Sequence, residues 1–287
     1  MSTQITTAMV EQYSANLQIA MQQSESRFRG AVRVESVTGK NAFFDSIGAT
    51  AATLRSNRHA DTPLVDTPHT RRRVTLLDYD WADLIDNLDN PKLLTDPQSK
   101  YVINARNAMN RAIDDAIIAA AMGTAYGGVA GATSYSFDTS NKTVANASTG
   151  LTLAKLLSAK AKLDADEVPD EGRYFACSAQ GMQDLLDIEE LTSMDYASVK
   201  ALVRGEIDTF LGFKFIRTER LAEASDVKSN LAWQRDSILL AIGKDIIVDV
   251  GPRRDKNMAI QVYLGMSIGA VRMDEKGVVE VESYEGT

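Results

Sequence analysis

The side chains most often used in catalysis are sparse in this sequence. It has two histidines, His59 and His69, both within a polar stretch, and one cysteine, Cys177, inside the apolar run RYFACS. A Ser-His-Asp or Cys-His site, or a metal site with two imidazoles, would have to draw on these two histidines. The apolar surroundings of Cys177 favour a buried structural thiol over a nucleophile. We therefore expect no catalytic or metal-binding residue in this set, and solvated loop histidines instead.

A group of glycines also invites a chemical interpretation. Gly123, Gly127, Gly128 and Gly131 lie close together, but their spacing matches neither of the two glycine-rich phosphate motifs, G-x-G-x-x-G and G-x-x-x-x-G-K-[ST]. They also follow a predicted helix, whereas a phosphate loop precedes one. We expect no phosphate or cofactor site here.

Carboxylates form two clusters. One runs along DYDWADLIDNLD, and the other is the pair Asp114-Asp115; the first cluster consists of Asp78, Asp80, Asp83, Asp86 and Asp89. Paired carboxylates can transfer protons or bind magnesium. Spacing by two and three residues is equally typical of a solvated or salt-bridging face. The second interpretation is the expected one, and a two-domain cytosolic enzyme with a carboxylate-lined site stays open as an alternative.

Composition narrows the class of protein. The chain has 287 residues, 44% of them hydrophobic, which is long enough to bury a sizeable core without staples. A lone cysteine forms no intramolecular disulfide, so the fold does not need an oxidising compartment. The first thirty residues lack a basic end followed by an apolar run, and no stretch approaches the roughly 18–20 apolar residues of a membrane span. The sequence predicts folding in a cytosol and no membrane partner.

Charge is distributed unevenly along the chain. The net charge is −8, which argues against a general nucleic-acid coat. Residues 27–73 nevertheless hold nine Lys/Arg and four Asp/Glu, a local net of +5, so the remainder carries −13. This pattern indicates that the basic segment meets acid, on nucleic acid or on an identical neighbouring subunit. Two unrelated solvated faces are the simpler alternative.

The predicted elements of the first third are an arm and a projecting β-loop. Residues 1–26 are polar, contain no Lys or Arg, and have only a loose helical stripe, which indicates an arm that needs a partner surface. Alternating valines in 31–50 and strand-like residues in 70–80 flank a long polar tip. An isolated two-stranded projection is marginal in water, so we expect another surface to cover it.

Helices and short strands alternate irregularly in the rest of the chain. Asp96-Pro97 predicts the start of a long helix over 96–122, with apolar residues at three- and four-residue steps, and Gly123 its end. A second helix is predicted over 151–168 and a strand-helix unit over 173–187. Strands are predicted over 212–221, on both sides of Gly243, and over 277–285. The class is α+β, without a βαβ rhythm.

This order of elements resembles that of the Hong Kong 97-like major capsid proteins of tailed bacteriophages. The most specific part of the resemblance is the C-terminal succession IIVDV, GPRRDK, MAIQVYLGMSIGAV, RMDEK and GVVEV. The resemblance implies an N-terminal arm (1–26), an extended E-loop (27–80), the first part of a P-domain with its spine helix (81–168), an A-domain (169–245) and a return to the P-domain (246–287). It extends over nearly the whole chain. The covalent lysine–asparagine cross-link known in the family cannot be located here, and Lys40 in the loop is no basis for it.

The resemblance also implies a function. The chain is expected to be a structural, non-enzymatic subunit that self-assembles as hexamers and pentamers into an icosahedral shell around double-stranded DNA, without a cofactor. Implied partners are a separate scaffolding protein, a portal protein and a decoration or cement protein, with only weak contact to packaged DNA. The expected localisation is the virion capsid, assembled in the host cytoplasm. A bacterial encapsulin-type nanocompartment shell protein, which shares the fold, is the nearest alternative.

The candidate site residues are those expected at contacts between subunits. In a strand, Arg71 and Arg73 share one face and Arg72 the other, and three adjacent cations gain little within one subunit. We expect the basic loop to meet the acidic cluster of a neighbouring subunit. The expected contact residues are Arg55, Arg58, Arg71, Arg72, Arg73, Asp78, Asp80, Asp83, Asp86 and Asp89.

Overall fold

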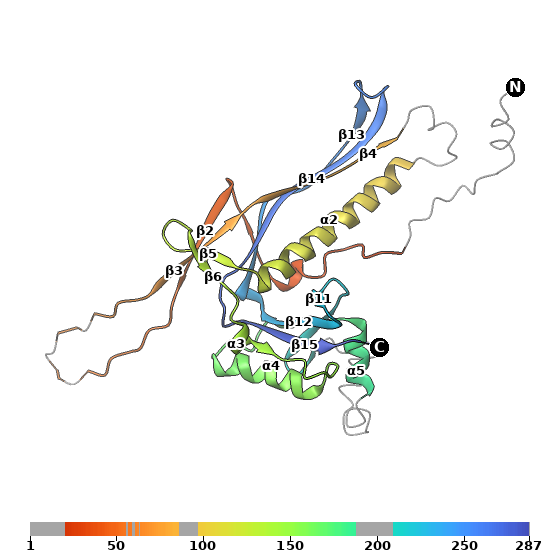
Figure 1. Ribbon diagram of the computed structural model, residues 1–287. Coiled ribbons are helices and arrows are strands. Elements are labelled where there is room, and N and C mark those ends of the chain that lie inside the picture. Colours follow the sequence, from red (N-terminus) through yellow and green to blue (C-terminus); the bar gives the residue numbers. More distant parts are fainter. Residues whose placement is uncertain are drawn as a thin grey trace, which may run out of the picture. The chain divides into compact units, whose positions relative to one another are not determined.

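The computed structural model describes residues 21–55, 57–58, 61–62, 64–85, 97–187 and 209–286 (Figure 1). The chain divides into two compact units. The first unit consists of Met1–Ser26, Leu77–Ile113 and Gly243–Ile268, and the second of Arg27–Leu76, Asp114–Ile242 and Gly269–Thr287. The predicted boundaries of arm, loop and domains stay a prediction.

The longest helix, α2, spans Pro97–Met122. Proline suits the first helical turn because its missing N–H has no partner there in any case. The predicted apolar stripe is buried at Ala105, Met109, Ile113 and Ile117. The helix ends at Gly123, whose N–H donates to the carbonyl of Ala119 at 2.9 Å. The predicted position and length of this helix are thus confirmed.

The first unit combines the N-terminal half of α2 with long strands. β4 (Leu77–Ile85) pairs antiparallel with β14 (Ala259–Arg272), from Leu77 opposite Ile268 to Ile85 opposite Ile260. β13 (Ile238–Arg253) contributes its residues from Gly243 onward. Residues 21–26 lie against α2, where the side chain of Asn110 donates to the carbonyl of Ser24 at 2.8 Å.

A mixed sheet forms the largest layer of the second unit. Its strand order is β7-β15-β12-β8-β10-β9, with β11 paired to β12. The register places β8 between β12 and β10, antiparallel to the first and parallel to the second. The strands are β7 (Thr143–Val144), β8 (Arg173–Cys177), β9 (Thr209–Phe210), β10 (Phe213–Arg217), β11 (Glu223–Ala224), β12 (Val227–Gln234) and β15 (Val278–Tyr284).

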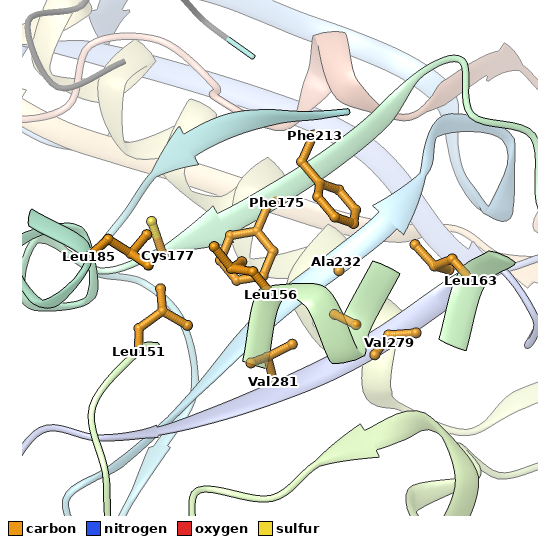
Figure 2. Close-up of a cluster of buried hydrophobic side chains, with 11 residues drawn as sticks. Leu151, Leu156, Leu163, Phe175, Cys177, Leu185, Phe213, Ala232, Val279 and Val281 are labelled. Carbon is orange, nitrogen blue, oxygen red and sulfur yellow. The ribbon is translucent and has the colours of Figure 1, made fainter. Parts of the chain in front are cut away.

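Helix α4 (Leu153–Ala165) covers this sheet and closes the core of the second unit, shown in Figure 2. Its N-cap is Thr152, whose hydroxyl accepts from the backbone N–H of Lys155 at 3.4 Å. Helix α5 (Ala179–Asp187) adds one leucine to the same core. The cluster joins α4 to four strands through Leu151, Leu156, Ala159, Leu163, Phe175, Cys177, Leu185, Phe213, Ala232, Val279 and Val281.

A smaller sheet carries the predicted projecting loop. Its order is β2-β3-β5-β6, built from β2 (Asn41–Ile47), β3 (His69–Thr75), β5 (Ala125–Gly127) and β6 (Thr133–Tyr135). β2 and β3 pair antiparallel over seven residues, as the sequence predicts. The valine-rich start of the predicted strand region is a separate strand, β1 (Arg33–Ser36), which pairs parallel with β13. The short helices are η1 (Arg29–Ala31), α3 (Thr139–Lys142) and η3 (Arg235–Ser237).

Two strands differ from the sequence prediction. The predicted break at Gly243 is wrong, because β13 runs without interruption through this residue. Gly243 instead marks the point where the strand passes from the second compact unit into the first. The sequence pattern assigns no strand to 222–236, yet β12 lies there, between β8 and β15. Buried polar residues such as Asn230 interrupt its apolar pattern.

Candidate intersubunit contact site

The β2–β3 hairpin ends in a segment that exposes large apolar side chains. The N–H of Gly48 donates to the carbonyl of Pro68 at 2.8 Å and closes the base of this segment. Beyond it, Leu54 is 93% exposed and Leu64 is 99% exposed. Among the described residues, Arg55 donates to the nearby carbonyl of Asn57, and Arg58 is exposed. Fully solvent-exposed apolar side chains that cluster on an extended loop are typical of a surface that another protein covers.

Arg71 is held within its own subunit by Asp45, its cross-strand neighbour on β2. The guanidinium Nε and Nη2 atoms donate to the two carboxylate oxygens at 2.6 Å and 3.0 Å. The Arg71 hydrogen bond lowers the pKa of the Asp45 carboxyl below its ordinary value. Because both side chains are exposed, the pair orders the hairpin more than it stabilises the fold.

Arg72 points to the opposite face of β3 and is buried. Its Nη2 donates to both carboxylate oxygens of Glu275, at 2.7 Å and 2.8 Å, and its guanidinium lies 3.7 Å from the centroid of the Tyr135 ring. Arg272 lies beside the same carboxylate and donates to the carbonyls of Ala121, near the end of α2, and of Gly123, which follows the helix. Burial lowers the pKa of Arg272. The carboxylate of Glu275 is therefore the counter-charge of two buried guanidinium groups, those of Arg72 and Arg272.

Arg73 has the least complete set of contacts of the three arginines. Its guanidinium lies 5.3 Å from the centroid of the Tyr126 ring on β5. Its buried Nε atom has no hydrogen-bond acceptor among the described residues.

The predicted alternation of the three arginines is confirmed. The expectation that adjacent arginines gain little within one subunit is wrong. Arg71 and Arg72 do gain partners within the subunit, because a short β-strand brings each of them opposite an acid that is distant in the sequence. Sequence spacing gave no signal for Asp45 or Glu275 as these partners. A role of the five arginines in contacts between subunits stays a prediction.

Three of the five predicted acids lie on β4 in the first unit. Asp80 accepts a hydrogen bond from the hydroxyl of Tyr263 at 2.5 Å, which raises the pKa of Tyr263. Asp83 accepts from the N–H of Leu84 at 2.8 Å, and Asp78 is exposed. Asp86 and Asp89 lie outside the described residues. A contact of these acids with a neighbouring subunit stays a prediction.

The other chemical candidates have structural roles in the described part of the chain. Burial raises the pKa of Cys177 to about 12, which makes it a poor nucleophile. Asp114 is fully buried and accepts from the backbone N–H groups of Arg27 and Phe28, while Asp115 pairs with Arg220. The Asp114 contacts hold the start of the basic segment against α2, and the Asp115 contact holds the segment after β10.

The described residues show few features of other kinds of functional site. No group of three or more metal-ligating side chains is found among the described residues. A pocket of about 250 Å³ in the second unit includes Asp166, Glu167, Asp236 and Asp274 in its lining, and none of the predicted acids. No helix in the described ranges has the length and apolar character of a membrane span. His69 is exposed, whereas His59 lies outside the description.

Comparison with protein families gives one match over almost the whole chain. A family model described as phage capsid protein matches residues 5–285. A comparison with curated protein sequences finds no significant match.

Solved structures with the same fold come from several phages. The capsid of the cyanophage P-SCSP1u gives a TM-score of 0.73 at 18% identity, covering 97% of this chain and 94% of the other. A structure from Mycobacterium phage Che8 gives 0.71 at 16% identity, covering 94% and 96%. The capsid of Ralstonia phage GP4 gives 0.75 at 12% identity, covering 96% and 95%. The predicted fold is confirmed over nearly the full length of the chain.

Proposed function

This chain belongs to the phage capsid protein family, and from that premise we propose how its copies build a shell. As a member it is a structural subunit of a phage capsid and part of the virion. The encapsulin-type and enzyme alternatives are not favoured by these comparisons. Hexamers and pentamers on an icosahedral lattice, enclosing double-stranded DNA, are the proposed assembly.

The observation that carries this assembly is the exposed apolar tip of the β2–β3 hairpin. Ile47 is 70% exposed, and Leu54 and Leu64 are almost fully exposed, so the tip buries little apolar surface in an isolated subunit. Covering three such side chains would contribute about 1.5–3 kcal/mol each before the cost of ordering the loop. The tip is proposed to lie on a neighbouring copy, with Arg55 and Arg58 beside acids of that copy.

Further partners follow from the proposal. A separate scaffolding protein guides closure, a portal protein occupies one vertex, and a decoration or cement protein binds the outer surface. Assembly takes place in the host cytoplasm. Packaged DNA is held by weak contact, because a net charge of −8 does not provide a broad basic face.

Limited proteolysis tests the proposed covering of the tip. Trypsin should cut after Arg55 or Arg58 much faster in free subunits than in assembled shells. Lys160, a partly exposed residue of the compact helix α4, provides an internal reference for cleavage within folded structure. Equal cleavage rates of the tip in both states would contradict its burial on a neighbour.

A further inference from the structure

The three consecutive arginines of β3 do not have equivalent surroundings. Arg71 and Arg72 each donate two hydrogen bonds to a carboxylate of their own subunit. Buried nitrogen atoms without an acceptor occur in both Arg72 (Nη1) and Arg73 (Nε). Arg73 differs because its guanidinium makes no hydrogen bond or ion pair with any described residue, whereas Arg72 is paired with Glu275. A buried guanidinium N–H without an acceptor is costly, which points to an acceptor supplied from outside the subunit.

Side chains of the neighbouring strands hold Arg73 in a defined position. The register places it opposite Phe43 on β2 and opposite Tyr126 on β5, so the three share one face of the sheet. Gly131 lies beneath them: a Cβ there would come within 2.7 Å of Cδ of Arg73 and 2.9 Å of the Phe43 ring. The arginine stem is thus fixed between two aromatic rings and backbone, at little further entropic cost on binding.

The rim of this position is apolar and exposed. Phe43 is 43% exposed and Tyr126 is 44% exposed, while Val129, in the turn between β5 and β6, is 91% exposed. We call Phe43, Arg73, Tyr126 and Val129 the Arg73 face. Arginine and aromatic residues surrounded by apolar contacts are the composition enriched in the centres of protein–protein interfaces.

We propose that the Arg73 face binds a carboxylate-bearing segment of a second copy of this chain. This rests on the proposed function, since a shell brings many copies into contact. Charge complementarity supports a second copy, because the chain outside residues 27–73 carries a net −13. A phosphate of DNA has similar chemistry, but a phosphate-binding surface would gather several free cations. Here the adjacent cation, Arg71, is already neutralised by Asp45.

A photo-crosslinker at Val129 identifies the occupant directly. Val129 is so exposed that p-benzoylphenylalanine in its place leaves the sheet intact. In irradiated shells we expect a covalent dimer, joined at a peptide of the second copy that contains Asp or Glu, and no dimer in unassembled subunits. Well-formed shells without such a dimer, or with the crosslink on DNA or on a different protein, would overturn the proposal.

The variant Arg73→Gln tests the charge itself. Loss of a charge-assisted hydrogen bond at an interface should raise the subunit concentration needed for assembly at least roughly tenfold. The matched control is Arg33→Gln, which removes an exposed arginine that pairs with Glu35, two residues away on the same strand. We expect this control to assemble at the wild-type concentration.

The outcomes separate the inference from the proposed function. If the wild-type chain forms no shells, the proposed function fails. If wild-type shells form and Arg73→Gln assembles at the same concentration, only the inference fails. Circular dichroism of each variant checks folding, and the crosslink at Val129 decides the question independently if Arg73→Gln is unstable.

Discussion

Glu275 lies beside two buried guanidinium groups, those of Arg72 and Arg272, so its neutralisation should be costly. In Glu275→Gln, the side chain keeps its shape and one acceptor oxygen but loses its charge. Arg72 and Arg272, which are 6% and 0% exposed, would then lie close together without a counter-charge. Repulsion between them adds to the loss of one of the two hydrogen bonds from Arg72.

The magnitude follows from the burial of the pair. Breaking a fully buried ion pair by removing one partner typically costs 3–5 kcal/mol. Glu275 is 30% exposed, and glutamine retains one hydrogen bond, so we expect a cost below this range, about 2–3 kcal/mol. For a chain of 287 residues, that corresponds to a fall in Tm of roughly 3–5 °C.

Unfolding of the unassembled subunit in urea measures this effect. Trp233 is fully buried in the second unit and stacks on Phe28 at 5.4 Å, so its fluorescence reports unfolding of the unit that contains Glu275. The matched control is Asp45→Asn, which neutralises the exposed carboxylate paired with Arg71, the residue adjacent to Arg72. This control should lose far less stability. Equal losses in the two variants, or no loss in Glu275→Gln, would refute the assignment of Glu275 as the shared counter-charge.

Three further variants or measurements test other parts of the fold. Lys155→Met should cost about 1–3 kcal/mol in urea unfolding, because the buried ammonium donates to three carbonyls of residues 146–150; an unchanged midpoint would contradict this. Cys177 should resist alkylation at about pH 8 in the native subunit and react only on unfolding, since its raised pKa keeps it protonated. Its contribution to stability is full below the ordinary pKa of 9.0 and is lost as pH rises toward about 12, so early alkylation would contradict its burial. Gly269→Ala should cost roughly 1–3 kcal/mol, because the new methyl group would lie 2.4 Å from the last carbonyl oxygen of β3; wild-type stability would show that β14 can shift.

Local signals explain why much of the fold could be predicted from the sequence. The proline at the start of α2 and the glycine after it are backbone effects that act within one turn, and both predicted ends agree with the structure. The Thr152 cap of α4 is equally local. The apolar run MAIQVYLGMSIGAV, which carries part of the family resemblance, lies almost entirely in β14.

Partners distant in the sequence explain most of what could not be predicted. Asn230 is polar but fully buried in β12, where its amide donates to the Ser283 hydroxyl at 2.8 Å and to the Val281 carbonyl. A polar residue at this position argues against a buried strand, and the two groups that satisfy its hydrogen bonds are more than fifty residues away in the sequence. The Arg72–Glu275 pair could not be predicted for the same reason, because its two residues are 203 positions apart in the sequence. β13 continues through Gly243 because its length is set by pairing with the neighbouring strands β1 and β14, and not by the local preference of glycine.

The central claim is that this chain builds capsid shells. Its most direct test is electron microscopy of the chain co-expressed with the proposed scaffolding protein, with particle size checked by light scattering. The account predicts closed, roughly spherical particles whose wall consists of this chain. A chain that stays a small soluble oligomer under all assembly conditions tested would contradict it.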